Sequence, residues 1–100
     1  PNSEYGERES KTESFRMKSI SPNPFNNSTV LTIELPISDQ VRVSVVDVLG
    51  REVMELTNSR LSQGPHQVFL NADNLSSGVY FVRAETASQG LIISKVMLLK

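Results

Sequence analysis

The chain has 100 residues, of which 38% are hydrophobic, and a formal net charge of −1. This size favours one domain with one compact core. The near-neutral charge argues against nucleic acid as a partner, because binding to phosphate relies on clustered positive charge. The absence of cysteine excludes disulfides, thiolate catalysis and cysteine-based zinc sites. No apolar run approaches the roughly 18 residues of a membrane-spanning helix.

The first fourteen residues, PNSEYGERESKTES, differ in composition from the rest of the chain. Six of them are charged, and Tyr5 is the only large apolar residue. Such a segment cannot bury enough surface to offset the entropy lost on ordering. We therefore predict a flexible linker at residues 1–14 and a single folded domain at residues 15–100. Because the chain begins at Pro1 and shows no signal peptide, we interpret it as a piece of a longer or processed protein.

After the linker, short segments of alternating apolar and polar residues are separated by turn residues. Strands are predicted at residues 15–20, 28–35, 40–48, 51–57, 64–71, 78–86 and 90–99, with a polar loop at 58–63. The residues expected to point inward are Leu31, Ile33, Leu35, Val41, Val43, Val45, Val68, Leu70, Tyr80, Val82 and Ala84. Turn signals about every 8–12 residues are typical of an antiparallel sandwich. We predict an all-β fold, an Ig-like sandwich of about seven strands.

One segment allows a helical alternative. Over residues 48–61, the side chains of Val53, Leu56 and Leu61 could share one face of a helix. Gly50 and the short length of the segment argue against this alternative.

The sequence from Leu75 to Tyr80 resembles a tyrosine corner, in which a tyrosine hydroxyl donates a hydrogen bond to upstream backbone. Gly78 is expected to permit a sharp turn where a Cβ would clash. The hydrogen bond contributes about 1 kcal/mol, and burial of the ring adds about 2 kcal/mol. We interpret this motif as structural.

The last predicted strand, GLIISKVMLLK, is apolar on both faces. One face carries Ile92, Ser94, Val96 and Leu98, and the other carries Leu91, Ile93, Lys95, Met97 and Leu99. If this strand lies at a sheet edge, it can pair with another chain, including a second copy in a homodimer. The alternative is that a loop or the N-terminal segment covers its outer face.

Residues for catalysis or metal binding are sparse. His66 is the only histidine, and Asp47, Glu52 and Glu55 are scattered over one predicted hairpin. The loop at 71–74 lacks the spaced acidic residues of a calcium site. No nucleotide-binding or nucleophile motif occurs. We predict no enzymatic activity, no cofactor and no metal.

Four short motifs occur in a fixed order between Ser21 and Lys100. The first is Pro22-Asn23-Pro24-Phe25, and the second runs from Asp47 to Val53 and contains Gly50 and Arg51. The third runs from Gly78 to Arg83 and contains Tyr80, and the fourth is Lys95-Val96 followed by the terminal Lys100. Together they closely resemble the C-terminal sorting domain of the type IX secretion system of Bacteroidetes. A motif similar to the second one, from Asp47 to Val53, also occurs in an Ig-like domain of the flagellar hook-capping protein. The position of Lys95-Val96 near the C-terminus favours the sorting domain over that family.

The resemblance implies a role in export. A cargo domain would precede this one, and an outer-membrane translocon would carry it from the periplasm to the cell surface or medium. A sortase-like peptidase would cut within residues 1–20 and anchor the cargo. The resemblance places the sorting signal at Gly78, Tyr80, Lys95, Val96 and Lys100, and structural motif residues at Pro22, Asn23, Pro24, Asp47, Gly50 and Val53. Deletion of residues 96–100 is expected to trap a fused passenger in the periplasm.

The alternative function is a passive Ig-like structural or carbohydrate-binding module. Sugar binding usually needs exposed aromatic rings, and the chain has no Trp, two Tyr and four Phe. Phe81, with Val79, points away from the Tyr80 face and would be the binding platform.

Overall fold

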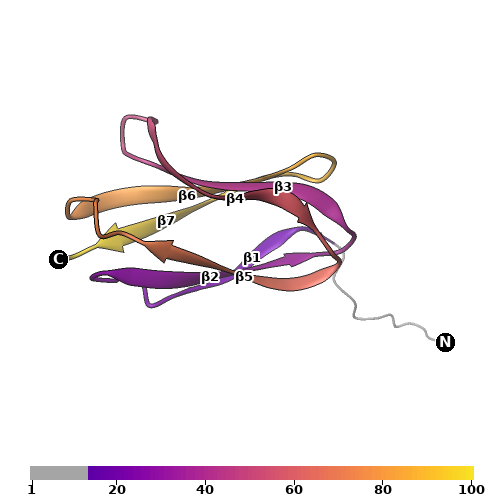
Figure 1. Ribbon diagram of the computed structural model, residues 1–100, viewed down its shortest axis with the longest axis horizontal. Helices are drawn as coiled ribbons and strands as arrows, with labels where there is room; N and C mark the ends of the chain where they lie inside the picture. The colour runs from indigo at the N-terminus through magenta and orange to yellow at the C-terminus, as the bar shows by residue number, and fades with distance from the viewer. Residues whose placement is uncertain (1–13) are drawn as a thin grey trace.

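The computed structural model describes residues 14–100, which form two antiparallel β-sheets packed face to face (Figure 1). The seven strands are β1 (Arg16–Ser21), β2 (Ser28–Leu35), β3 (Asp39–Val46), β4 (Glu52–Leu61), β5 (Gly64–Asn71), β6 (Gly78–Thr86) and β7 (Gly90–Leu98). Residues 14–100 contain no helix, and therefore none that could span a membrane. The all-β sandwich prediction is confirmed, whereas the predicted linker lies almost entirely outside the described residues.

The two sheets differ in size and leave four edge strands. The smaller sheet has the order β1-β2-β5 and the larger has the order β4-β3-β6-β7. Neighbouring strands are antiparallel throughout. On one side of the sandwich β1 lies near β7, and on the other side β4 lies near β5. The last strand is therefore an edge strand of the larger sheet.

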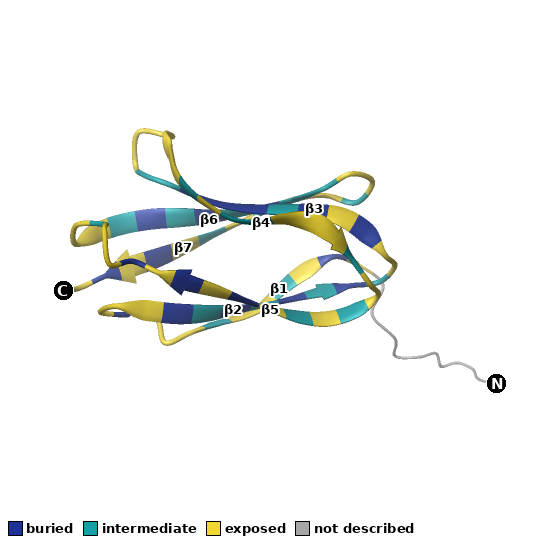
Figure 2. Cartoon of the chain, viewed as in Figure 1, coloured by how far each residue is buried: buried dark blue, intermediate teal, exposed yellow. Residues whose placement is uncertain are grey.

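The core lies between the sheets and follows the alternation of the sequence. Figure 2 shows buried residues alternating with more exposed ones along the strands. Every residue predicted to point inward is buried, including Leu31 and Val43, which are fully buried. Phe15, Phe25, Ala72, Val96 and Leu98 complete this core. Full burial of an aliphatic side chain contributes about 1.5–3 kcal/mol, so this alternation is the main favourable term for folding.

β4 is longer than predicted. It continues to Leu61, and Asn58 and Arg60 pair with Arg42 and Gln40 of β3. The prediction of a loop at 58–63 is therefore wrong, and so is the helical alternative for 48–61. A strand at a sheet edge is held by main-chain pairing on one side, so it tolerates a run of polar side chains.

Asp39, which precedes the strand predicted at residues 40–48, begins β3 and anchors the turn between β6 and β7. Its Oδ2 accepts hydrogen bonds from Ser88 Oγ at 2.7 Å and from Gln89 Nε2 at 2.9 Å, and its Oδ1 accepts one from the Gln40 amide at 2.8 Å. These bonds, the one from Gln89 first, lower the pKa of Asp39 to about 2. The ionised carboxylate thus holds the entry to β7 in place.

Replacing this carboxylate should change how stability depends on pH. The folded protein favours the ionised form, so Asp39 stabilises it above the ordinary pKa of 3.8, and this contribution is lost as the pH falls through about 2. We expect Asp39→Asn to be less stable than the wild type at pH 7, with a difference that shrinks between pH 4 and pH 2, a range set by these two values. Urea unfolding over this pH range measures the difference. Asp73→Asn is the control, because no described residue donates a hydrogen bond to its carboxylate; a pH-independent deficit in Asp39→Asn would contradict the prediction.

Candidate functional site

All four sequence motifs lie at or next to one end of the sandwich, which we call the motif end. It consists of the loop at 22–27, the turn at 47–51, the loop at 72–77 and residues 96–100. The C-terminus lies at this end, whereas β1 begins at the other end (Figure 1). Antiparallel connectivity explains this arrangement, because every second connection returns to the same end of a sandwich. Motifs far apart in the sequence are thereby brought together.

The second motif is a tight turn between β3 and β4. Asp47 Oδ1 accepts hydrogen bonds from the amides of Leu49 at 2.9 Å and Arg51 at 3.0 Å, and its Oδ2 accepts one from Arg51 Nε at 2.9 Å. The bond from the Arg51 amide is the main reason why the pKa of Asp47 lies below its ordinary value. Gly50 has a φ of +84°, which L side chains rarely adopt. Asp47 and Gly50 therefore shape the turn.

This turn presents two apolar side chains that were not among the predicted site residues. Val48 was expected at the end of a strand, but it lies at the tip of the turn beside Leu49, and both are exposed. Val53 is partly exposed as well. The signal for the tip residues was present, because an Asp-x-x-Gly spacing places its two middle residues at the apex of a turn.

The third motif is a tyrosine corner, as predicted. The Tyr80 hydroxyl donates a hydrogen bond to the carbonyl of Ser76 at 2.7 Å, and the tyrosine is buried. The prediction that a Cβ at position 78 would clash is wrong, because a Cβ added to Gly78 would meet nothing within 4 Å. Instead, its φ of +155° favours glycine. A shallow groove separates this corner from the Asp47 turn.

The first motif fastens the loop at 22–27 to the outer edge of β7. The Asn23 side chain donates a hydrogen bond to the carbonyl of Lys95 at 3.1 Å and accepts one from the amide of Met97 at 3.1 Å. Phe25 continues this pairing through its main chain. Its amide donates a hydrogen bond to the Met97 carbonyl at 2.9 Å, and its carbonyl accepts one from the Leu99 amide at 2.8 Å. The peptide bonds that precede Pro22 and Pro24 are cis. Asn23 thus acts as a short substitute for a neighbouring strand.

The two faces of β7 have different surroundings. Val96 and Leu98 are fully buried in the core, so Val96 of the fourth motif is inaccessible in the folded domain. The opposite face, which we call the β7 face, consists of Leu91, Ile93, Lys95, Met97 and Leu99 and is exposed. No loop of residues 14–100 covers it. The β7 face therefore places Lys95 among exposed apolar side chains.

Lys100 is tied back to the motif end. Its amide donates a hydrogen bond to Ser77 Oγ at 2.9 Å, and its Nζ donates one to the carbonyl of Asp73 at 2.9 Å. The loop that was weighed as a calcium site therefore binds a lysine ammonium through its backbone. Within residues 14–100, no three His, Asp or Glu side chains are grouped so as to hold a metal ion.

The surface beside the β7 face is apolar toward the motif end and charged toward the other end. Val79 and Phe81 of β6 lie opposite Met97 and Lys95 and are half-buried, whereas Arg83 and Glu85, which form an ion pair, lie opposite Ile93 and Leu91. On β3, Arg42 forms ion pairs with Glu52 and Glu55, and these carboxylates raise its pKa above the ordinary range. Exposed ion pairs add little stability, so their main effect is to bound the apolar area.

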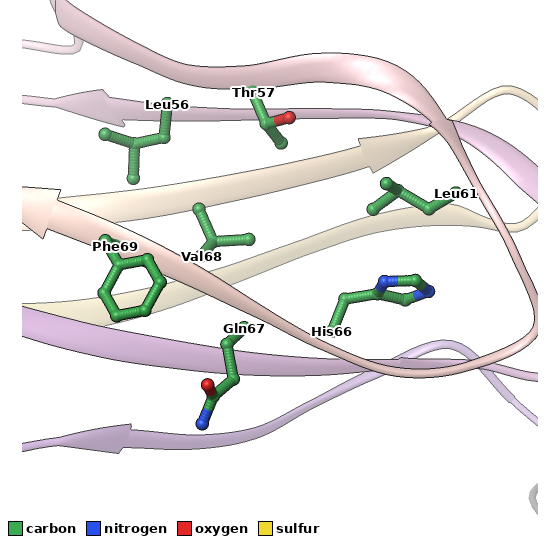
Figure 3. A pocket seen from close by; sticks show the side chains of 7 residues that line it. All are labelled: Leu56, Thr57, Leu61, His66, Gln67, Val68 and Phe69. Atoms are coloured by element: carbon green, nitrogen blue, oxygen red, sulfur yellow. The ribbon is translucent and has the colours of Figure 1, made fainter.

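His66 lies far from the motif end, in a shallow groove between β4 and β5 (Figure 3). Its Nε2 lies 2.7 Å from the carbonyl of Ser62. The remaining lining residues are Leu56, Thr57, Leu61, Gln67, Val68 and Phe69, none of which is titratable. This groove holds no second acid or base that could act with the histidine.

Comparison with known proteins agrees with this geometry. The family model described as the secretion system C-terminal sorting domain matches residues 19–99, which span all the described loops of the motif end. No curated protein and no solved structure matches the chain significantly. The matched family is not a family of enzymes. The chain therefore belongs to the family of C-terminal sorting domains of the type IX secretion system.

Proposed function

We propose that this domain directs an attached cargo protein across the outer membrane, and that the export machinery recognises it through the β7 face. Family membership implies attachment to a cargo and interaction with the type IX system. The observation that carries the proposal is the exposure of Leu91, Ile93, Met97 and Leu99 around a single charge, Lys95, on an edge strand. Exposed apolar clusters of this kind mark interaction sites.

The chemistry of the β7 face fits a protein partner. Docking would remove the exposed parts of several aliphatic side chains from water, at about 25 cal/mol per Å² of apolar area. Lys95 adds selectivity, because a partner that lacks a matching acceptor would leave the ammonium desolvated without a partner. The cargo would be attached ahead of β1, at the opposite end of the sandwich from the motif end (Figure 1). A bulky cargo therefore need not cover Met97 or Leu99.

Cleavage and anchoring form the second part of the proposal. A sortase-like peptidase would release the domain and transfer the cargo to the cell surface. Its cut was expected within residues 1–20, but β1 begins at Arg16 and pairs with β2. A peptidase acts on extended, unpaired backbone, so we place the cut before Arg16.

The expected effect of deleting residues 96–100 cannot test recognition alone, because the deletion would also remove Val96 and Leu98 from the core. Surface substitutions avoid this problem. In a type IX-competent host, we expect a passenger fused to the Met97→Ser, Leu99→Ser double variant to reach the medium or cell surface about tenfold less, as for the loss of a binding hot spot. The passenger should accumulate in the periplasm, as measured by fractionation and immunoblotting.

Phe69→Ser is the matched control, because Phe69 is 70% exposed on the other sheet. It should export like the wild type. Lys95→Ala should lower export without changing the urea midpoint, since exposed substitutions scarcely affect folding. Undiminished export of the Met97→Ser, Leu99→Ser variant would rule out the β7 face as the recognised surface.

No observation favours the carbohydrate-binding alternative. Its expected platform, Phe81, is half-buried and lies between Val46 and Lys95 of the neighbouring strands. A stacked sugar needs a free ring face. Loss of glycan binding on Phe81→Ala would be the result that revives this reading.

A further inference from the structure

The backbone of β7 has one edge paired with β6 and one edge facing outward. In an antiparallel strand, the amide and carbonyl of one residue point to the same side, and successive residues alternate. The bonds of Lys95, Met97 and Leu99 to the loop at 22–27 show that odd-numbered residues face outward. The register with β6 runs from Gly90 to Leu98 without a bulge. The amides of Leu91, Ile93 and Lys95 therefore also point to the outer edge.

Only part of this outer edge is hydrogen-bonded, although β1 of the smaller sheet lies near β7 on the same side of the sandwich. Asn23 and Phe25 bind it from the Lys95 carbonyl to the Leu99 amide. No residue among 14–100 forms a hydrogen bond with the outward groups of Leu91 and Ile93 or with the Lys95 amide. We call this open stretch, residues 91–95, the edge window. It is a short template for one more strand.

We propose that the edge window pairs through its main chain with an extended segment of the export machinery, which adds a fifth strand to the larger sheet. This inference rests on the proposed function, since it assigns a docking mode to the same strand. The side chains that flank the window on the exposed face are Leu91, Ile93 and Lys95. A complementary segment would carry two apolar side chains and one acidic side chain on that face, the acid opposite Lys95.

Asn23 sets the limit of this pairing. The side-chain amide of Asn23 already binds the backbone on both sides of Val96. An added strand therefore cannot continue beyond Lys95 without displacing the Asn23 side chain. The loop at 22–27 thus leaves a window of defined length and register. This explains how Asn23, more than seventy positions away from Lys95 and Met97 in the sequence, can take part in recognition through β7.

A second copy of the chain fits the window less well. In a two-fold antiparallel pairing centred on Ile93, Lys95 would lie opposite Leu91 of the other copy, and the acid beside Leu91, Glu85 of β6, is already paired with Arg83. A strand pair of five residues buries far less than the roughly 1,200 Å² of a stable interface with any partner, so main-chain pairing would add to contacts with the β7 face and not replace them. Charge therefore favours a strand from a different protein.

Proline substitution tests main-chain pairing directly. Proline lacks an amide hydrogen and is tolerated at edge positions whose amide faces solvent. We expect Ile93→Pro to lower passenger export about tenfold, equivalent to about 1.4 kcal/mol of binding free energy, whereas Ile93→Ser, which keeps the amide, should lower it less. Arg60→Pro is the matched control, because the Arg60 amide faces outward on β4, the opposite edge of the same sheet. It should export like the wild type.

Two results would overturn the inference. One is export of Ile93→Pro at the level of Arg60→Pro; the other is an equal loss from Ile93→Ser, which would mean that the side chain and not the backbone is recognised. If the Met97→Ser, Leu99→Ser variant still fails to export in either case, the proposed function stands and only the pairing mode fails.

Hydrogen exchange of the wild type decides the matter if Ile93→Pro unfolds. The Ile93 amide should exchange quickly in the free domain and several-fold more slowly with detergent-solubilised outer membranes from a competent host, but not with membranes from a strain that lacks the translocon. Equal exchange in both preparations would contradict the inference. Slowing that depends only on the concentration of the domain would instead identify a second copy as the partner, and would also overturn it.

Discussion

Leu98→Ala is expected to lower the free energy of unfolding by about 2–5 kcal/mol, the range for truncating a buried leucine. Leu98 is fully buried, pairs with Gly78 of β6 and forms a bridge with Phe25. The substitution would leave a cavity where the last strand meets the loop at 22–27. Urea unfolding followed by circular dichroism measures the loss.

The adjacent residue provides a close control for this prediction. Leu99 has the same side chain but is 53% exposed. Leu99→Ala should therefore stay within about 0.5 kcal/mol of the wild type, as surface substitutions usually do. If the two variants lost equal stability, the assignment of opposite faces to Leu98 and Leu99 would be wrong.

Tyr80→Ala should have a loss of similar size, about 3–5 kcal/mol, as for other large aromatic residues in a core. Its ring lies in the core beside Val82 and Val96, and its hydroxyl is bonded to Ser76. The variant should thus lose both the packing of the ring and the anchor of the corner. Thermal unfolding would show the change as a lower midpoint.

Tyr80→Phe separates these two contributions. It keeps the ring and removes the hydrogen bond of 2.7 Å to the Ser76 carbonyl, so we expect a loss of only about 1 kcal/mol. A loss as large as that of Tyr80→Ala would show that the hydroxyl, and not the ring, dominates the corner. Neither change alters a residue of the β7 face.

These variants also separate folding from recognition. Gly78, Tyr80 and Val96 were expected to carry the sorting signal, yet the structure gives them roles in a turn and in the core. A loss of export in such variants would therefore not by itself show contact with a partner, because it can follow from a loss of folding. Lys95 is exposed, so its substitution reports on contact with a partner.

Several features follow from the sequence alone. Side chains that alternate with a period of two define strands and their inward faces, which is why Leu31, Val43 and Val82 are all buried as predicted. Asp47, Gly50 and Tyr80 act over fewer than five residues, so their turns can be read from local spacing. The motif pattern was sufficient to identify the family.

Other features depend on which strands become neighbours, and local periodicity carries no such information. The length of β4 was missed because its polar half is held by pairing with β3. Asn23 looked like an ordinary loop residue until the fold brought it against Lys95 and Met97. The edge position of β7, its covered half and its open half were likewise decided by tertiary structure. Main-chain groups are chemically alike at every residue, so only the packed arrangement determines which of them remain free for a partner.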